Sequence, residues 1–294
     1  MLDSNRTNSS SAVPPTKNRD AVVYLTRSSQ LDLLKRSIDL LCDNFLPDNP
    51  ADVFVFHEDD CDLDALRRAT ERANSSFCRV DFSSVPPGCE NLSRGQIGYR
   101  HMCRFFANEW FLRPELDGYG FVMRMDVDSF ILSPCKTDLF ATMRRQGSRY
   151  AYRAVTTDAR KFCTGFWETA AKHFEDSGVV PKDGFRKDFG KPLVYYTNFE
   201  ICDLSWFRDL PWQSFFKDVD LAGGIAKYRW GDHIIRYAGL QALMDPAEIW
   251  QATPLHYQHW YRWKAGSRHR NLPWLLRCYA KTAVAVAKEK LHLS

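Results

Sequence analysis

The sequence predicts an α/β fold built around a parallel sheet, and two observations lead to that prediction. Short apolar runs typical of buried strands recur in the first 85 residues, at 21–25, 52–56 and 77–82. Between them, apolar residues recur at helical spacing in residues 31–45 and 63–73. Strand–helix–strand connections are right-handed and make neighbouring strands parallel, so this alternation predicts a sheet with helices packed on its faces.

The later elements continue the pattern less regularly. After a loop containing Pro86, Pro87 and Gly88, residues 99–112 have helical spacing and lead to the apolar run at 120–123, a further buried strand. The second half is more aromatic. There we expect strands at residues 150–155 and 195–201 and a helix at 232–244. Between them, residues 176–192 predict a polar loop that could form a lid over an acceptor.

Length and charge define three parts of the chain. Its 294 residues, 45% of them hydrophobic, suffice for one large core. Residues 1–18 are rich in Ser, Asn, Pro and Thr and predict a disordered leader or stem, which leaves 19–263 as the folded domain. Residues 264–294 hold seven Lys or Arg and one Glu, a net charge of +6. They predict a basic helical tail, either lying on a membrane surface as a peripheral contact or partly packed and solvated.

Composition also excludes several classes of protein. The whole chain carries +4, so residues 1–263 carry −2, and the folded domain is not a nucleic-acid binder on electrostatic grounds. No apolar run is long enough to span a bilayer and no signal peptide is evident, so we expect a soluble or truncated chain. The nine cysteines are scattered without CxxC pairs, which argues against structural zinc. Four Asn-x-Ser/Thr sequons permit a location in the secretory lumen.

The most informative residues are two aspartates that follow the apolar run 120–123. Because side chains alternate along a strand, Asp126 and Asp128 should lie on the same side of the chain. Two carboxylates converging at a strand end suit Mn²⁺ or Mg²⁺, which keep positions open for substrate phosphates. The pattern therefore predicts a metal site able to hold a nucleotide-sugar diphosphate, with a solvated acidic turn as the alternative.

Polar residues also follow the first two strands. Thr26 and Arg27 come directly after residues 21–25, and His57 and Glu58 come after 52–56. Open α/β sheets bind ligands at the carboxyl ends of their strands. These residues and the two aspartates therefore predict one site at that edge of the sheet.

Three further positions are candidates for chemistry. Arg100 and Arg104 share one helix face and suit a phosphate or a carboxylate, although an arginine such as Arg104 alone more often forms a structural ion pair. Glu200 is an isolated carboxylate in an apolar strand and needs a partner or a function. Asp232 and His233 begin a helix, where they could bind substrate or simply cap it.

Taken in order, three motifs carry a family resemblance. They are YRHMCRF at 99–105, NFEICDLSWFR at 198–208 and LAGGIAKYRWGD at 221–232. In these motifs, and more loosely over residues 22–259, the chain resembles the fungal-type α-1,2-mannosyltransferases (glycolipid 2-α-mannosyltransferases), Golgi enzymes that use GDP-mannose.

The resemblance implies a fold and an activity. The fold would be a single nucleotide-diphospho-sugar transferase domain, Rossmann-like and of the GT-A type, with a mixed, mainly parallel sheet. The activity would be retaining, Mn²⁺-dependent transfer of mannose from GDP-mannose to a glycan acceptor in α-1,2 linkage, in the Golgi or secretory lumen, with Mg²⁺ as the alternative ion. Glu200 would act as nucleophile or as electrostatic support at the anomeric carbon. The expected donor-binding residues are Thr26, Arg27, Tyr99, Arg104, Asp126 and Asp232.

The chain also departs from the family. It has Asp126-Val127-Asp128 where the family has Glu-Pro-Asp, and Arg236 aligns with the expected metal-binding histidine. We therefore predict a metal site of Asp126, Asp128 and His233, with His256 and His259 as alternatives for the third ligand. A transferase of the same fold that uses UDP-galactose or UDP-xylose, and a non-catalytic carbohydrate-binding descendant, remain alternative functions.

Overall fold

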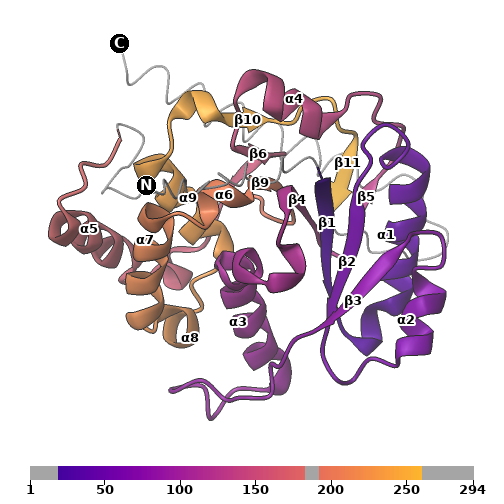
Figure 1. Ribbon diagram of the computed structural model, residues 1–294. Helices are drawn as coiled ribbons and strands as arrows, with labels where there is room; N and C mark the ends of the chain where they lie inside the picture. Colours follow the sequence, from indigo (N-terminus) through magenta and orange to yellow (C-terminus); the bar gives the residue numbers. More distant parts are fainter. Residues whose placement is uncertain (1–18, 183–191, 260–294) are drawn as a thin grey trace, which may run out of the picture.

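A seven-stranded sheet organises the computed structural model, which describes residues 19–182 and 192–259 (Figure 1). The strand order is β10-β6-β9-β4-β1-β2-β3. Its strands are β1 (Arg19–Thr26), β2 (Asp52–His57), β3 (Ser75–Arg79), β4 (Tyr119–Met125), β6 (Tyr150–Tyr152), β9 (Phe199–Asp203) and β10 (Ile249–Gln251). β9 runs antiparallel to β4 and β6, whereas the other neighbouring strands are parallel. The predicted mixed, mainly parallel sheet is confirmed.

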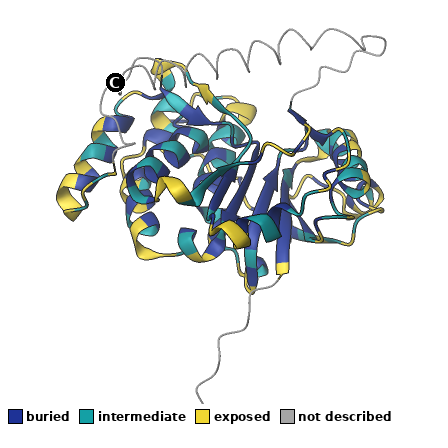
Figure 2. Cartoon of the chain, turned by 90° about the horizontal axis from the view of Figure 1, so that it is seen from above, coloured by how far each residue is buried: buried dark blue, intermediate teal, exposed yellow. Residues whose placement is uncertain are grey.

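Two hydrophobic cores lie on the two faces of this sheet. Along β1, Ala21 and Val23 pack into one core while Val22 and Tyr24 pack into the other, because successive side chains point to opposite faces. The core that contains Val22 is covered by α1 (Leu31–Asn44), α2 (Leu63–Ala69) and α4 (Leu139–Gln146). The other is covered by α3 (Arg94–Ala107), α5 (Phe166–Ser177), α6 (Leu204–Phe207), α7 (Leu210–Leu221), α8 (Gly224–Tyr228) and α9 (Asp232–Leu243). The strands between these layers are largely buried (Figure 2).

The first half of the chain follows the predicted order of elements. The main difference is α3, predicted at 99–112, which begins at Arg94 and ends at Ala107. Ser93 caps the helix, accepting from the backbone N–H of Gln96 while the Gln96 side chain accepts from the Ser93 backbone. Such a capping box fixes where a helix begins independently of its apolar spacing. A 3₁₀ turn (Glu109–Leu112) continues the predicted segment.

In the second half, two predicted strands are each divided in two. The segment 150–155 forms β6 and the start of β7 (Val155–Thr157), and 195–201 forms the end of β8 (Leu193–Tyr195) and the start of β9. β7 pairs with β8 in a separate two-stranded sheet, as does β5 (Ser129–Ile131) with β11 (Tyr257–His259). Further 3₁₀ turns lie at Ser28–Gln30, Pro114–Leu116, Arg160–Phe162 and Pro246–Glu248.

Helices α4, α5, α6, α7 and α8 were not predicted. The expected lid at 176–192 falls partly on α5, which extends to Ser177, and partly outside the described residues. The predicted leader at 1–18 and basic tail at 264–294 also lie outside them. None of the helices described is long and apolar enough to cross a membrane.

Candidate functional site

The two aspartates lie in a tight turn that joins β4 to β5. The backbone N–H of Ser129 donates to the carbonyl of Asp126 at 2.9 Å and closes the turn. β4 ends at Met125, so the side chains converge because the chain turns, and not because of the strand alternation we expected. Their side chains are 26% and 22% exposed, which leaves the carboxylates accessible at the carboxyl end of the central strand.

His259 is the third member of this cluster. β11 pairs with β5 so that His259 lies opposite Ser129, the residue that follows the turn. Its Nε2 atom is 3.1 Å from Oδ1 of Asp128 and 3.8 Å from Oδ2 of Asp126. On the other side of the ring, Nδ1 is 2.7 Å from the hydroxyl of Tyr196. The tyrosine thus orients the imidazole so that Nε2 faces the carboxylates.

The donor set fits a divalent first-row metal. One ligand atom from each of Asp126, Asp128 and His259 lies within 4.8 Å of the others. An octahedral ion with ligands at about 2.1 Å places those atoms about 3 to 4.2 Å apart, so small side-chain movements would close the site. Two carboxylates and one imidazole suit Mn²⁺, which accepts oxygen and nitrogen donors. The Tyr196 hydroxyl supplies the outer hydrogen bond usual for a metal-binding histidine.

A buried set of hydrogen bonds supports the turn from below. The Tyr257 hydroxyl donates to the side-chain oxygen of Asn198 at 2.7 Å and lies 2.6 Å from the Ser129 hydroxyl. The Asn198 carbonyl accepts from the backbone N–H of Asp126 at 3.1 Å. These bonds join β5, β11 and the turn before β9. They hold the turn that carries Asp126 and Asp128 against the paired strands β5 and β11.

Arg124 connects the metal cluster to helix α9. Its side chain is 3% exposed and donates to Asp126 at 2.9 Å and to Asp232 at 2.5 Å. The Thr197 hydroxyl also donates to Asp232, at 2.6 Å. Burial disfavours the charged form of Asp232, but Arg124, His233 and the Thr197 hydroxyl outweigh it and hold the pKa of the Asp232 carboxyl below its usual value. Asp232, expected to bind donor, is in this structure a partner of Arg124.

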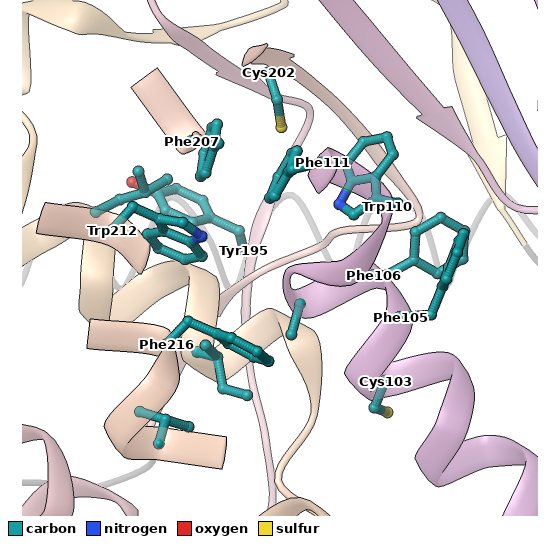
Figure 3. Close-up of a cluster of buried hydrophobic side chains, with 14 of the residues drawn as sticks. Cys103, Phe105, Phe106, Trp110, Phe111, Tyr195, Cys202, Phe207, Trp212 and Phe216 are labelled. Carbon is teal, nitrogen blue, oxygen red and sulfur yellow. The ribbon is translucent and has the colours of Figure 1, made fainter. Parts of the chain in front are cut away.

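Glu200 is completely buried and paired with Arg236. Nε of Arg236 donates to the carboxylate at 2.9 Å, and both side chains are 0% exposed. The guanidinium also packs within 5 Å of the rings of Phe111, Phe207 and Trp212, part of the aromatic cluster in Figure 3. Burial raises the pKa of Glu200, although Arg236 and Arg124 oppose this effect. Arg236 therefore compensates the charge of the carboxylate that was expected at the anomeric carbon.

His233 does not join the two aspartates. Its Nε2 atom is 2.8 Å from a carboxylate oxygen of Asp158, on the segment after β7. The ring lies over Gly231, where an added Cβ atom would be 2.0 Å from it. The structure thus contradicts the predicted grouping of His233 with the two aspartates, and His259, one of the two alternatives, takes that position. His256, the other, is exposed and 3.3 Å from the Ser133 hydroxyl.

The remaining predicted donor residues differ in their surroundings. β1 is parallel to β4 with Val23 opposite Arg124, so Thr26 and Arg27 emerge at the same edge as the aspartates. Tyr99 stacks against the guanidinium of Arg229. Arg104 forms ion pairs with Asp220 and Glu109. For Arg104 the structure thus shows the structural ion pair that was the alternative.

The structure is thus an α/β fold in which two aspartates and a histidine, a set able to bind a divalent cation, meet at the carboxyl end of the central strand. Residues 90–272 match the family described as glycolipid 2-alpha-mannosyltransferase. Because these residues make up more than half of the chain, the chain belongs to that family.

Two curated relatives from Saccharomyces cerevisiae illustrate the distance within the family. The chain is 25% identical over 271 residues to the protein named probable mannosyltransferase KTR3, covering 83% of this chain and 67% of that protein. It is 28% identical over 171 residues to alpha-1,2 mannosyltransferase KTR1, covering 55% of this chain and 44% of that protein. The chain thus spans about half to two thirds of the length of these relatives.

Two solved structures share the fold. Core-mannan synthase A from Aspergillus fumigatus, in a form with Mn and GDP, matches with a TM-score of 0.74 at 18% identity, covering 90% of this chain and 83% of that one. The mannosyltransferase Ktr4p from S. cerevisiae, in complex with GDP, matches with a TM-score of 0.72 at 19% identity, covering 85% and 73%. The likeness to these mannosyltransferases confirms the predicted type of fold.

Proposed function

We propose that this chain is a metal-dependent, retaining glycosyltransferase that transfers mannose from GDP-mannose to a glycan acceptor in α-1,2 linkage. Family membership supports the reaction class. The observation that carries the proposal is the meeting of Asp126, Asp128 and His259 at the carboxyl end of the central strand. These three residues would hold Mn²⁺, which when bound would neutralise the negative charge of a diphosphate leaving group.

The chain's own residues prepare the site for an anionic donor. Arg124 holds Asp126 from one side and offsets part of the negative charge that the two aspartates bring together. Tyr196 keeps the His259 ring turned toward them. Thr26 and Arg27, at the end of the neighbouring strand, lie where the nucleotide of a donor would cross the sheet edge.

For Glu200, the proposal favours electrostatic support over covalent attack. A nucleophile must reach the anomeric carbon, whereas this carboxylate is fully buried and held by Arg236. Strands β4 and β9 are paired so that Glu200 lies directly opposite Arg124. Glu200 would therefore act through Arg124, by keeping that guanidinium charged and in place.

The ion pair between Glu200 and Arg236 favours a second candidate function, that of a non-catalytic descendant that binds a nucleotide sugar or glycan without turnover. Transfer from another nucleotide sugar, UDP-galactose or UDP-xylose, is a further alternative on the same site. A panel of nucleotide sugars, assayed for Mn²⁺-dependent hydrolysis or transfer, separates all three. Turnover of GDP-mannose with a retained anomer supports the main proposal, and binding without turnover of any donor supports the second.

A single variant links the activity to the metal centre. Asp128→Ala should abolish turnover, because one carboxylate fewer leaves the ion weakly held, while the fold persists because the residue lies in a partly exposed turn. Asp176→Ala, which removes an exposed acid on α5, serves as the control. Full activity of Asp128→Ala, or of the native protein with excess chelator, would contradict the proposal.

We also propose a location in the Golgi or secretory lumen, which rests on the family resemblance. A fluorescent fusion to the full-length protein, compared with a Golgi marker, tests it. The proposed membrane contact of the basic tail concerns residues outside those described, and binding to vesicles with anionic lipids, with and without residues 264–294, tests that part.

A further inference from the structure

The segment between α8 and α9 is held in place at several points. The indole of Trp230 packs on Gly224 so closely that a Cβ atom there would lie 2.2 Å from the ring. The same indole donates to the carbonyl of Thr164 at 2.8 Å. Two residues further on, Asp232 is tied to Arg124, and His233 is tied to Asp158. This segment therefore has a fixed backbone.

Within it, Arg229 adopts a left-handed backbone conformation. Its φ of 68° and ψ of 38° make it the one non-glycine residue with positive φ among residues 19–182 and 192–259. Such a conformation costs an L-residue with a long side chain about 1–2 kcal/mol relative to glycine. Strain of this kind persists where the surroundings determine the conformation, and it concentrates at functional sites.

The guanidinium of Arg229 is held between two aromatic rings. Its Cζ atom is 4.5 Å from the centre of the Tyr99 ring and 3.9 Å from that of Phe162. A guanidinium that lies over aromatic rings can still donate through its N–H groups. In the part of the chain that the structure describes, no carboxylate forms an ion pair with it; Asp158, whose carboxyl it influences, bonds to His233 instead. The charge is thus oriented but not neutralised by a direct pair.

The position of Arg229 in the chain connects it to the proposed metal centre. It stands three residues before Asp232, the first residue of α9. Asp232 contacts Arg124, which contacts the proposed metal ligand Asp126. Arg229 therefore lies on the segment that these hydrogen bonds fix beside the proposed cation site.

We propose that Arg229 binds the diphosphate of the nucleotide donor. The inference rests on the proposed function and adds a named phosphate ligand to it. A guanidinium edge matches two phosphate oxygens, and a rigid group loses little entropy when it binds them. The stacking rings and the strained backbone set this orientation before the ligand arrives.

The test measures binding of GDP and UDP, each with saturating Mn²⁺, to the full-length protein by isothermal titration calorimetry. Both nucleotides carry the diphosphate, so the result does not depend on which base the protein prefers. Charged hydrogen bonds of this kind predict a loss of affinity of about 10- to 100-fold in Arg229→Gln. Guanosine and uridine, which lack phosphate, should bind equally to wild type and variant. Arg229→Lys keeps the charge without the fork and should fall between the two.

Lys227→Gln is the matched control. Lys227 stands two residues earlier, is exposed, and stacks on Tyr228 at 4.9 Å, so its loss removes a charge and a stacking contact from the same segment. Equal affinity for the diphosphates in wild type and Arg229→Gln, or an equal loss in the control, overturns the inference. If Arg229→Gln does not fold, Arg229→Lys decides, and undiminished affinity in that variant overturns it. If wild type binds no nucleoside diphosphate at all, the proposed donor class fails first.

Discussion

His259, His233 and His256 differ in what surrounds their rings. His259 faces two carboxylates and is oriented by Tyr196, His233 is engaged by Asp158, and His256 is exposed. His259→Ala should therefore weaken Mn²⁺ binding at least tenfold, because an imidazole ligand is lost, whereas His233→Ala should leave it within about twofold. Titration with Mn²⁺, with the free ion followed by electron paramagnetic resonance, measures the Mn²⁺ affinity of both variants. His256→Ala is the control; a large loss in His233→Ala with none in His259→Ala would refute this ligand set.

Arg236 stabilises the folded protein by compensating the buried charge of Glu200. Removing one member of such a pair costs about 3–5 kcal/mol, because the other charge stays buried without a partner. Arg236→Met should lower the free energy of unfolding by that amount. The double variant Glu200→Leu/Arg236→Met, which removes both charges, should recover much of the loss. Urea unfolding measures the free energy of unfolding of both variants. If Arg236→Met were as stable as wild type, Glu200 would have to be neutral in the folded protein.

At the scale of elements, the connection from α8 to α9 depends on close packing of Trp230 against Gly224. A methyl group at Gly224 would meet the indole ring at 2.2 to 2.3 Å, and the ring is fixed by its bond to Thr164. Gly224→Ala should therefore destabilise the protein by about 1–3 kcal/mol. It should also move Trp230 fluorescence, because the indole must shift.

Gly98 provides the opposite case on helix α3. An added Cβ atom there has no heavy atom within 4 Å, and the backbone is helical. Gly98→Ala should raise the free energy of unfolding by about 0.5–1 kcal/mol, since alanine restricts the unfolded chain. Thermal unfolding of Gly224→Ala and Gly98→Ala checks both predictions. Equal changes in stability would mean that the close contact between Gly224 and Trp230 does not determine the effect of the added methyl group.

At the scale of the whole molecule, local sequence patterns predict individual strands and helices but not the contacts between residues that are distant in sequence. The buried strands, the first helices and the closeness of Asp126 and Asp128 were predictable, because these patterns extend over a few residues. His259 was only an alternative, since it reaches the turn through the pairing of β11 with β5, which places it opposite Ser129 in a distant part of the sequence. The Glu200–Arg236 pair depends likewise on packing between β9 and α9. Spacing along the chain does not carry such long-range partners.

The Arg124–Asp232 pair joins two elements that are distant in sequence, and it should make stability depend on pH. The pKa of Asp232 is below its usual value in the folded protein, so its contribution is present above the unfolded pKa, about 4, and is lost as the pH falls through the folded pKa. Asp232→Asn stays neutral and leaves Arg124 less compensated. We expect this variant to be about 3 kcal/mol less stable than wild type at pH 7.

The difference between wild type and Asp232→Asn should then narrow as the pH falls from about 5 toward 2, because wild-type Asp232 becomes protonated and resembles the variant. Groups shared by both proteins cancel in the comparison, so the narrowing reports this one carboxyl. Urea unfolding at a series of pH values measures it. Asp176→Asn, at an exposed site on α5, should stay within about 0.5 kcal/mol of wild type throughout. A difference that stayed constant down to pH 2 would mean that Asp232 is not held charged by Arg124.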